Sequence, residues 1–289
     1  MTALRTRGDL CPGVARPWVA ADGALVRLRL VGGQISLAAL GKLADVSSRY
    51  GDGDIHLTTR ANLQLRGLPA ADGLLPAEVV DTLAATGLVP SPSHELVRNV
   101  MVSPLTGISG GRADLRPVAR ALDAGLCAAP LLASLPARFL FVLDDGRGDV
   151  AGRSLDLGLV ALSATTAQLR FGSAWGPVVG LGEAPARLLS LAHRFLESRG
   201  DGATAAWHVA ELDRPLAPGQ DPDPLAPTAT APPTFADVTH LDVPAGVLTP
   251  ALIDGLLGSG VDRLVVTPWH GVLLIDPSVD RSVDRSGQA

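Results

Sequence analysis

The first 70 residues alternate hydrophobic and polar positions with two different periods. Residues 24–30, ALVRLRL, alternate with period two, which predicts a half-buried strand that presents Arg27 and Arg29 on one face. After a VGG turn, residues 35–50 have the apolar spacing of a helix, and GDGD follows its end. Residues 55–67, IHLTTRANLQLRG, are predicted to form a second strand. The pattern therefore indicates a strand–helix–strand unit.

Both periods recur in the middle of the chain. Helices are predicted at 76–88, 113–130 and 183–200, and a strand pair at 155–163 and 167–172. ARFLFVLDDGRGD is predicted as a strand that runs into an Asp-Gly turn. The stretch from 215 to 233 is so rich in Pro, Ala and Asp that it predicts an extended linker with no packed core. The middle block is thus α plus β, and a linker follows it.

After this linker the first unit recurs. VPAGVLTPALIDGLL matches VGGQISLAALGKLA, and DRLVVTPWHGVLL matches DIHLTTRANLQLR. The alignment pairs Gly33 with Gly246, the N-cap Ser36 with Thr249, Asp54 with Asp262, and Thr59 with Thr267. The alternative is chance similarity between two amphipathic segments. We predict a duplicated strand–helix–strand unit.

Composition narrows the class of protein. With 289 residues, 47% of them hydrophobic, the chain is long enough to fold with a proper core. No apolar run approaches the roughly 18 to 20 residues of a spanning helix, so we expect no membrane partner. Because the start of the chain lacks the apolar stretch of a secretory signal, we expect a cytoplasmic protein. The chain has two cysteines, Cys11 and Cys127, which cannot form a disulfide framework, so none is expected.

Charge is distributed unevenly along the chain. Residues 1–70 contain nine Arg or Lys and five Asp, a local charge of +4, so the total of −5 leaves −9 for the remainder. The first part of the chain is therefore suited to holding an anion, although an Arg-rich codon usage explains the same count. Nucleic acid is not an expected partner, because the net charge is negative and only 3% of residues are aromatic.

The second predicted strand has an unusual polar face. Period-two alternation puts Thr58, Arg60, Asn62, Gln64 and Arg66 on one side. Guanidinium and amide groups in a row suit a ligand with several carboxylates, because each carboxylate accepts two parallel hydrogen bonds from an arginine. A solvated outer face of a sheet accounts for the same pattern. Both explanations stay open at the level of this strand alone.

Six segments carry a family resemblance. They are DLCPGVARPW, LVRLRLVGGQIS, GDIHLTTRANLQLRGL, HELVRNVMVSPLTG, LPARFLFVLDDGRGDV and VTPWHGVLL. Together, from residue 9 to about 275, they resemble the nitrite and sulfite reductase superfamily. Within it, CPG, SPLTG and FLFVLDDGRGD are most similar to the precorrin-3B synthase branch, which acts in aerobic cobalamin biosynthesis.

The resemblance implies an α+β fold with a pseudo-two-fold axis. Two ferredoxin-like half-domain repeats are expected to flank a nitrite/sulfite reductase-type α+β domain, with the second such domain missing, so that the chain looks C-terminally truncated. The implied domains are a first half-domain at 1–90, a sirohaem-reductase-type domain at 91–214, the linker at 215–234, a second half-domain at 235–276 and a disordered tail at 277–289.

Cofactors and site residues are also implied by the resemblance. Sirohaem or a corrinoid precursor is the expected tetrapyrrole, and its carboxylates are expected near Arg27, Arg29, Thr59, Arg60, Asn62, Arg66, Arg98, Asn99 and Arg138. The family's [4Fe–4S] cluster needs four cysteines beyond the second half-repeat, whereas this chain has only Cys11 and Cys127. Leu140 and His270 stand where relatives carry basic residues. His270 is either an axial ligand or a strand-end residue beside Trp269.

No metal-ligating residues are predicted. Asp144, Asp145 and Asp149 lack the twelve-residue calcium pattern and are interpreted as a hairpin turn held by Asp side chains. The VGG turn is no dinucleotide fingerprint.

Three functions follow from these observations. The first is a precorrin-3B synthase-like oxidoreductase, to which no catalytic residue is assigned. Its cysteine domain is then either lost through a truncated or frame-shifted coding sequence or supplied by a separate chain. The second is a non-catalytic tetrapyrrole-binding protein. The third is a remnant without the cluster domain and without activity.

Overall fold

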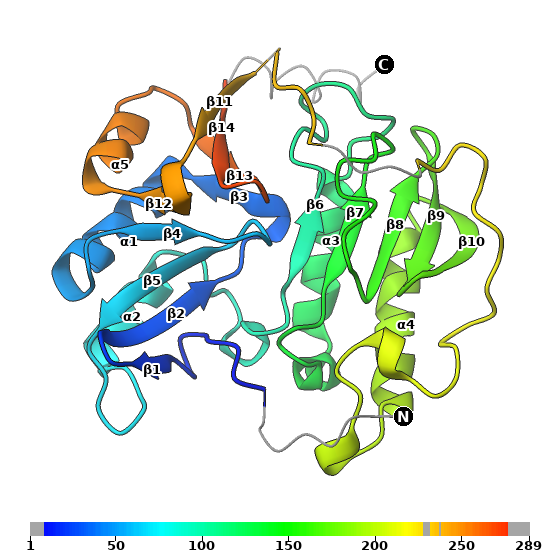
Figure 1. The fold of residues 1–289 in the computed structure, drawn as a ribbon, viewed down its shortest axis with the longest axis horizontal. Coiled ribbons are helices and arrows are strands. Elements are labelled where there is room, and N and C mark those ends of the chain that lie inside the picture. Colours follow the sequence, from blue (N-terminus) through cyan, green and yellow to red (C-terminus); the bar gives the residue numbers. More distant parts are fainter. Residues whose placement is uncertain (1–8, 228–231, 237, 277–289) are drawn as a thin grey trace. The chain divides into compact units, whose positions relative to one another are not determined.

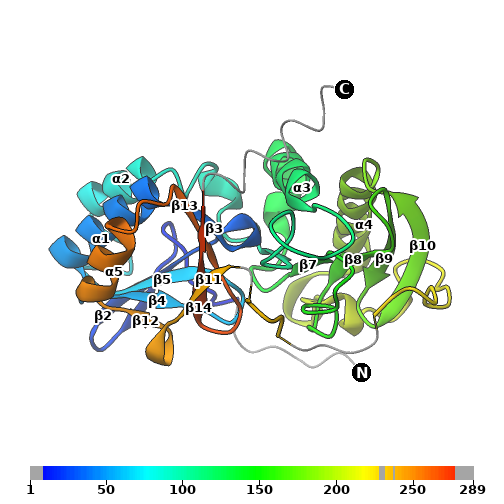
Figure 2. The same cartoon turned by 90° about the horizontal axis from the view of Figure 1, so that it is seen from above.

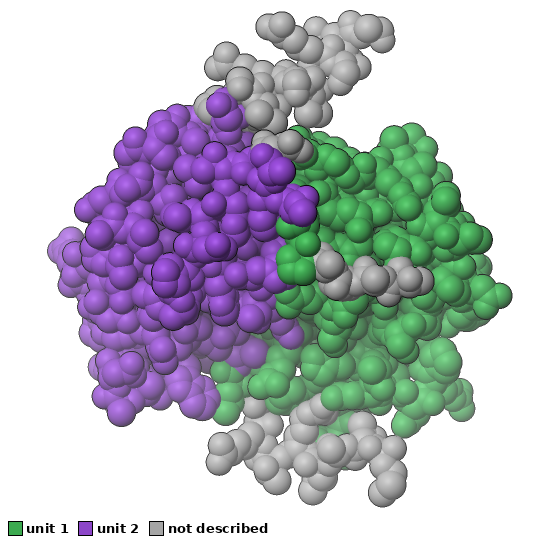
Figure 3. Space-filling model, turned by 45° about the horizontal axis from the view of Figure 1, so that its top comes forward, with its two compact units in different colours: residues 1–10, 96–233 green, residues 11–95, 234–289 purple. Residues whose placement is uncertain are grey.

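The computed structural model describes residues 9–227, 232–236 and 238–276 (Figure 1). The chain divides into two compact units, coloured separately in Figure 3. We call residues 11–95 and 234–289 the repeat unit, and residues 1–10 and 96–233 the central unit. Each unit is described by itself. The predicted tail at 277–289 lies outside the described residues.

The repeat unit contains two copies of one succession of elements. The first copy comprises β1 (Trp18–Ala20), β2 (Gly23–Leu28), β3 (Gln34–Ser36), α1 (Leu37–Tyr50), β4 (Ile55–Leu57), β5 (Leu63–Leu68) and α2 (Ala77–Ala85). The second comprises β11 (Thr239–Asp242), β12 (Val247–Leu248), α5 (Pro250–Leu257), β13 (Arg263–Val266) and β14 (Gly271–Ile275). A short 3-10 turn precedes β3 and β12 in the same place, at Val31–Gly33 and Pro244–Gly246.

The two copies exchange one strand each. The sheets have the orders β1-β2-β5-β4-β12 and β11-β14-β13-β3, with every pairing antiparallel. Strand β12 of the second copy therefore completes the first sheet beside β4, and β3 of the first copy completes the second sheet beside β13. Each copy supplies an edge that the other copy needs, so the two form one folding unit.

Two glycines make this exchange sterically possible. Gly33 and Gly246 both adopt a positive φ, 72° and 70°, which side-chain-bearing residues rarely adopt. A Cβ atom on Gly33 would lie 2.3 Å from the carbonyl oxygen of Val266 in the second copy. A Cβ on Gly246 would lie 3.3 Å from the carbonyl oxygen of Leu57 in the first. These reciprocal contacts confirm the predicted equivalence of the two glycines.

Helices α1 and α5 also begin in the same way in the two copies. The Ser36 hydroxyl accepts a hydrogen bond from the Ala39 N–H at 3.1 Å, and the Thr249 hydroxyl accepts one from the Leu252 N–H at 3.5 Å. Each side chain satisfies one of the backbone donors left open at the first turn of its helix. The predicted N-caps are confirmed.

The predicted strand at 55–67 is wrong, because residues 58–62 turn. The Thr58 N–H donates to the Asn62 carbonyl at 3.0 Å, and the Thr58 hydroxyl accepts from the Asn62 N–H at 3.1 Å. Ala61 has a φ of 56°, which ends the extended conformation. The segment is therefore a hairpin of β4 and β5, and period-two alternation holds only within each short strand.

The same turn corrects the predicted repeat alignment by one residue. In the second copy, the Thr267 hydroxyl accepts from the Gly271 N–H at 3.1 Å, and His270 has the positive φ, 59°. Thr58 is therefore the equivalent of Thr267, where the sequence alignment had paired Thr59. The hydrogen bonds of the two turns thus identify Thr58 and Thr267 as equivalent, which the comparison of the two amino-acid sequences did not.

The core of the repeat unit lies between its helices and the inner face of the sheets. Strand β2 alternates as predicted, with Ala24, Val26 and Leu28 at most 1% exposed and Arg27 half-buried on the other face. Helices α1, α2 and α5 lie on one side of β2, β4, β5 and β12 (Figure 2). The opposite face of the first sheet carries the polar residues of the candidate site.

The central unit is a mixed five-stranded sheet. Its strands are β6 (Val100–Val102), β7 (Phe141–Asp144), β8 (Leu157–Ala161), β9 (Thr166–Phe171) and β10 (Ala174–Gly180), in the order β10-β9-β8-β7-β6. Strands β6, β7 and β8 are parallel, and β8, β9 and β10 are antiparallel. Helices α3 (Arg116–Ala128) and α4 (Ala184–Ser198) lie on one face, close to their predicted bounds (Figure 1).

Part of the Pro/Ala-rich segment is bound to this sheet. The Gln220 N–H donates to the Trp175 carbonyl at 2.8 Å. The Gln168 side chain donates to the Asp221 carbonyl at 2.8 Å and accepts from the Asp223 N–H at 2.7 Å. This differs from the prediction of a linker without packed residues. An amide side chain on the sheet satisfies backbone groups that a proline-rich segment cannot pair within itself.

None of the helices in the described ranges combines the length and apolar character that a bilayer span requires.

Candidate anion-binding site

The first sheet of the repeat unit carries a row of polar side chains across three adjacent strands. Arg27 on β2 lies opposite Gln64 on β5, and Gln64 lies opposite His56 on β4. Arg27 Nη2 donates to Gln64 Oε1 at 3.2 Å. Arg66, two residues beyond Gln64, lies on the same face and is half-buried. We call Arg27, His56, Gln64 and Arg66 the polar row.

His56 was missed by the sequence analysis, which treated 55–67 as one strand. Its Nε2 lies 3.2 Å from Asp52 Oδ2. Pairing β4 with β5 as a hairpin would have placed His56 opposite Gln64, because a five-residue turn fixes the register of the two strands. The feature that the sequence analysis missed was the turn at residues 58–62.

The turn between β4 and β5 holds three further predicted residues. Thr59 is exposed and Arg60 is half-buried. Asn62 is only 1% exposed, and its Oδ1 accepts a hydrogen bond from the Leu30 N–H at 2.9 Å. The predicted common face for residues 58 to 66 is therefore wrong for Asn62, which points into the unit. Its Nδ2 has no hydrogen-bond partner among the described residues.

Arg29 lies just beyond the end of β2 and is 3% exposed. Its Nη1 donates to the Pro12 carbonyl at 3.3 Å and the Arg27 carbonyl at 3.4 Å. The contacts bind the segment around Pro12 to the edge of the sheet. They give Arg29 a structural role in the repeat unit beside the ligand role that the family resemblance implies.

Three predicted residues lie in the central unit. Arg98 is 6% exposed, and its Nε and Nη2 donate to the two Asp123 carboxylate oxygens, both at 2.7 Å. Burial lowers the pKa of Arg98, but the bonds and charge of Asp123 raise it above its usual value. Asn99 is 2% exposed and donates to main-chain carbonyls. Arg138 is exposed.

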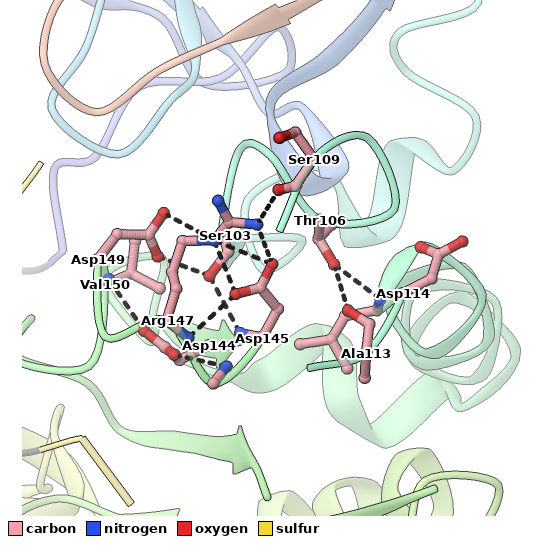
Figure 4. A network of polar contacts seen from close by, with 12 residues as sticks. Ser103, Thr106, Ser109, Ala113, Asp114, Asp144, Asp145, Arg147, Asp149 and Val150 are labelled. Atoms are coloured by element: carbon pink, nitrogen blue, oxygen red, sulfur yellow. Dashed lines mark hydrogen bonds and ion pairs between the residues drawn. The ribbon is translucent and has the colours of Figure 1, made fainter. Parts of the chain in front are cut away.

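A second polar cluster follows β7 and is shown in Figure 4. Asp144 accepts hydrogen bonds from the N–H groups of Gly146, Gly148 and Val150, at 2.9, 3.0 and 3.1 Å. Asp145 accepts from Arg147 Nε and Nη2, at 2.9 and 2.7 Å. Asp side chains hold this turn, as predicted, but the prediction of a hairpin is wrong. The turn leads into the parallel strand β8, so it begins a crossover and no hairpin.

The third carboxylate joins this turn to the loop after β6. Ser103 donates its hydroxyl hydrogen to Asp149 Oδ1 at 2.6 Å and accepts from the Asp145 N–H at 3.0 Å. One oxygen from each of Asp144, Asp145 and Asp149 lies within 4.8 Å of the others, all three residues being buried. Burial, and then the charges of Asp144 and Asp145, raise the pKa of Asp149 to about 7.

The two units hold different shares of the predicted site. The repeat unit contains Arg27, Arg29, Thr59, Arg60, Asn62 and Arg66, and the central unit contains Arg98, Asn99 and Arg138. Within the repeat unit the half-buried guanidinium groups of Arg27 and Arg66 share one sheet face. Such a face is suited to carboxylate or phosphate groups, which accept charge-assisted hydrogen bonds. The repeat unit therefore has a ferredoxin-like fold in which one sheet face carries two half-buried arginines, and we treat this face as a candidate anion-binding site.

Comparison with known families agrees with this class. Residues 20–73 match the Nitrite/Sulfite reductase ferredoxin-like half domain, and they include β2 to β5 and the whole polar row. The chain is 33% identical over 186 residues to a precorrin-3B synthase of Sinorhizobium sp, which covers 63% of this chain and 37% of that protein. It thus carries a nitrite/sulfite reductase ferredoxin-like half domain and is a homologue of precorrin-3B synthase, as predicted.

Two further similarities extend the comparison. A ferredoxin–nitrite reductase of Synechococcus elongatus is 36% identical over 130 residues, 43% of this chain and 25% of that protein. The solved structure of the Mycobacterium tuberculosis NirA protein superposes with a TM-score of 0.64 at 20% identity, over 91% of this chain and 57% of that one. This likeness confirms the α+β nitrite/sulfite reductase-type fold. The chain spans less than two thirds of each of these proteins.

Proposed function

We propose that this chain is the tetrapyrrole-binding part of a precorrin-3B synthase-like oxidoreductase. The observation that carries the proposal is the polar row, in which Arg27 and Arg66 lie half-buried on one face of β2 and β5. A flat macrocycle with carboxylates around its rim matches several cations spread over a sheet face. A cytoplasmic setting, which the sequence predicts, is part of the same proposal.

Electrostatics favours a ligand with several carboxylates over one with a single charge. A half-buried guanidinium interacts with an anion through a lower effective dielectric than a solvated one does. Each arginine can donate two parallel hydrogen bonds to one carboxylate. Arg27 and Arg66 lie on adjacent strands, so a ligand with several carboxylates can place one carboxylate on each arginine.

The relatives support the class of reaction. One similar protein is a precorrin-3B synthase, whose name gives a tetrapyrrole precursor as its product, and another is a ferredoxin–nitrite reductase, whose name gives a redox reaction. By this similarity we propose a redox step on a corrinoid precursor or, with sirohaem, on a small anion. The tetrapyrrole, when bound, supplies the redox chemistry. The residues of this chain bind and orient its carboxylates.

An iron–sulfur cluster does not fit the residues of this chain. A [4Fe–4S] cluster is held by four cysteine thiolates. The chain has two cysteines, and Cys11 belongs to the repeat unit while Cys127 belongs to the central unit. We therefore derive no electron-transfer step through these residues and propose that a separate polypeptide supplies the electrons.

A second candidate function is tetrapyrrole binding without catalysis, as in a carrier. The cysteine count favours it, because the polar row needs no cluster in order to bind a polycarboxylate. The two functions differ in one observable property: only the oxidoreductase turns over when an electron donor and the partner polypeptide are added.

A titration tests the shared part of both functions. Purified chain is titrated with uroporphyrin and with coproporphyrin, which has fewer rim carboxylates, and binding is followed by absorbance. Wild-type protein is expected to bind uroporphyrin more tightly, and Arg66→Ala and Arg27→Ala to weaken it by roughly ten-fold, about the effect of one charge-assisted bond.

The matched control is Arg49→Ala. Arg49 is on α1, its side chain is 68% exposed, and its ion pair with Glu78 is far more solvated than the polar row. Its removal is expected to leave binding unchanged. Equal affinity of wild type, Arg27→Ala and Arg66→Ala would refute the proposed function.

A further inference from the structure

His56 lies at one end of the polar row, with a carboxylate beside it. Its cross-strand neighbours are Gln64 on β5 and the uncharged Val247 on β12. His56 Nε2 lies 3.2 Å from Asp52 Oδ2, and the two side chains are 19% and 36% exposed. The imidazole is therefore held on the sheet face, and its carboxylate partner is nearer to the solvent.

Main-chain bonds fix Asp52 in this place. Its N–H donates to the Arg66 carbonyl at 3.1 Å, which holds the turn before β4 against β5. Its Oδ1 accepts from the Asp54 N–H at 3.0 Å. One carboxylate oxygen of Asp52 thus stabilises the turn, and the other lies beside His56.

Charged residues of three elements lie around His56 on this sheet face. Asp52 belongs to the turn before β4, Arg66 to β5, and Arg27 to β2, two strands away from β4. Neighbouring strands lie about 4.8 Å apart, so Arg27 and His56 are separated by roughly 10 Å, close to the Debye length at moderate salt. A charge on His56 therefore acts on an anion bound anywhere along the row.

His56 is the member of the polar row whose type of side chain responds to pH. Histidine changes its charge between about pH 5 and 8, whereas arginine stays protonated. With a neutral imidazole, the row carries the two positive charges of its arginines, and Asp52 places a negative charge at its end. A protonated imidazole adds a third positive charge and pairs with that carboxylate. The attraction of the row for an anion therefore increases as pH falls.

We propose that Asp52 and His56 form a proton-dependent regulator of the polar row. Protonated His56 supplies a third cation for a ligand with several carboxylates, and ionised Asp52 opposes the ligand when His56 is neutral. The pair thereby makes retention of the ligand depend on pH. The inference rests on the proposed function for the identity of that ligand.

The first test compares uroporphyrin binding at pH 8 and pH 6 in the full chain. Carboxyl groups ordinarily titrate at about pH 4, so the ligand keeps its charge over this range. Wild-type protein is expected to bind roughly five-fold more tightly at pH 6, about the effect of one partly solvated charge pair. His56→Gln is expected to bind equally at both pH values. The matched control is His193→Gln on α4, which is expected to keep the wild-type pH dependence. An equal pH dependence in wild type and His56→Gln would overturn the proposal.

A second variant tests the carboxylate. Asp52→Asn keeps an oxygen for the Asp54 N–H and removes the negative charge. Uroporphyrin binding at pH 8 is expected to tighten by roughly two- to five-fold, because a like charge no longer opposes the ligand. Glu78→Gln, at a 63% exposed side chain on α2, is the control and is expected to leave binding unchanged. Equal affinity of wild type and Asp52→Asn would refute the opposing role of Asp52.

Sulfate serves as a probe that does not depend on the tetrapyrrole. Its binding is followed by the NMR ring C–H signals of His56, assigned by their loss in His56→Gln, and is expected to be tighter at pH 6 than at pH 8. Sulfate binding with this pH dependence, together with no binding of uroporphyrin, would support the regulator and refute the proposed function. Uroporphyrin binding that is unaffected by His56→Gln at both pH values would support the proposed function and overturn the regulator.

Discussion

The two copies in the repeat unit share a backbone but differ in the side chains of one sheet face. The equivalent pairs are Arg27 and His240, Gln64 and Leu273, and Arg66 and Ile275, as the strand pairings require. The first copy is polar on this face. In the second copy, His240 stacks on Phe235 with ring centroids 4.0 Å apart, and Ile275 is 5% exposed.

Residues that both copies keep are those that the backbone needs. Gly33 and Gly246 allow the exchanged strands to approach, and Thr58 and Thr267 close the same turn. The residues that differ have no part in these contacts. The duplicated unit thus has two kinds of position: one set specifies the exchanged fold, and another set gives the first copy the polar face on which the proposed function depends.

The largest expected effect concerns the exchange itself. Gly33→Ala is expected to lower the free energy of unfolding by roughly 5 kcal/mol, because its Cβ would lie 2.3 Å from a backbone oxygen at an unfavourable φ. Gly246→Ala has a similar φ, but its Cβ would come no closer than 3.2 Å to another atom, in the His270 ring, so about 2 kcal/mol is expected. Urea unfolding measures both, and equal losses would contradict the steric argument.

The control for this pair is Gly255→Ala. Gly255 lies inside α5, and a Cβ there would have no heavy atom within 4 Å. Alanine is favoured over glycine within a helix by about 1 kcal/mol, so a small gain in stability is expected.

The second prediction concerns the pH dependence of stability that Asp149 gives to the central unit. Folding raises the pKa of Asp149 from 3.8 to about 7, so the folded chain holds a proton that the unfolded chain releases. This contribution is complete below about pH 4 and is lost as pH rises through 7, on the order of 4 kcal/mol in total. Asp149→Asn is expected to remove this pH dependence in urea unfolding, whereas Asp52→Asn, at an exposed site, retains it.

A titration curve for Asp149→Asn that follows the wild-type curve would refute the role of the acidic cluster.

The third prediction concerns Arg27→His, a substitution that makes the polar face of the first copy more like that of the second. Arg27→His gives β2 the residue that β11 has, and burial already holds the pKa of His240 below its usual value. Loss of a permanent charge is expected to weaken uroporphyrin binding by roughly ten-fold at pH 8. At pH 5 a protonated imidazole is expected to recover part of that loss. Binding that is insensitive to this change would place the anion elsewhere.

The smallest effect tests the corrected alignment. Thr58→Ala and Thr267→Ala each remove the hydroxyl that closes a turn, and about 1 kcal/mol of unfolding free energy is expected from each. Thr59→Ala, at an exposed position, is expected to change stability by less than about 0.5 kcal/mol. A larger loss of unfolding free energy from Thr59→Ala than from Thr58→Ala would instead support the pairing of Thr59 with Thr267.

Some features of the fold could be predicted because they depend on neighbours in sequence. The N-caps at Ser36 and Thr249 need only a hydroxyl and the amide three residues later. The alternation in β2 needs only the period of a strand. The hairpin turn at 58–62 escaped prediction, since an alanine at positive φ has no signal in the sequence.

Site residues were harder to predict, because an arginine or asparagine does not specify its partner. Arg98 was expected at a ligand, but its guanidinium forms two hydrogen bonds with Asp123 on α3. Asn99 was expected there too, yet its amide binds the carbonyls that flank Arg138. Both partners lie more than twenty residues away, and only packing brings them within hydrogen-bond distance.

The sequence alone specified the repeat, the helices close to 37–50, 116–128 and 184–198, and the resemblance to nitrite and sulfite reductases, because each depends on local spacing or on ordered motifs. The tertiary structure decided that β3 and β12 exchange sheets, and which polar groups point outward as the polar row. The physical reason is that a strand's unpaired backbone groups accept any adjacent strand of suitable register. The choice between partners depends on steric clearances such as that of Gly33 against Val266, which arise only when the two copies meet.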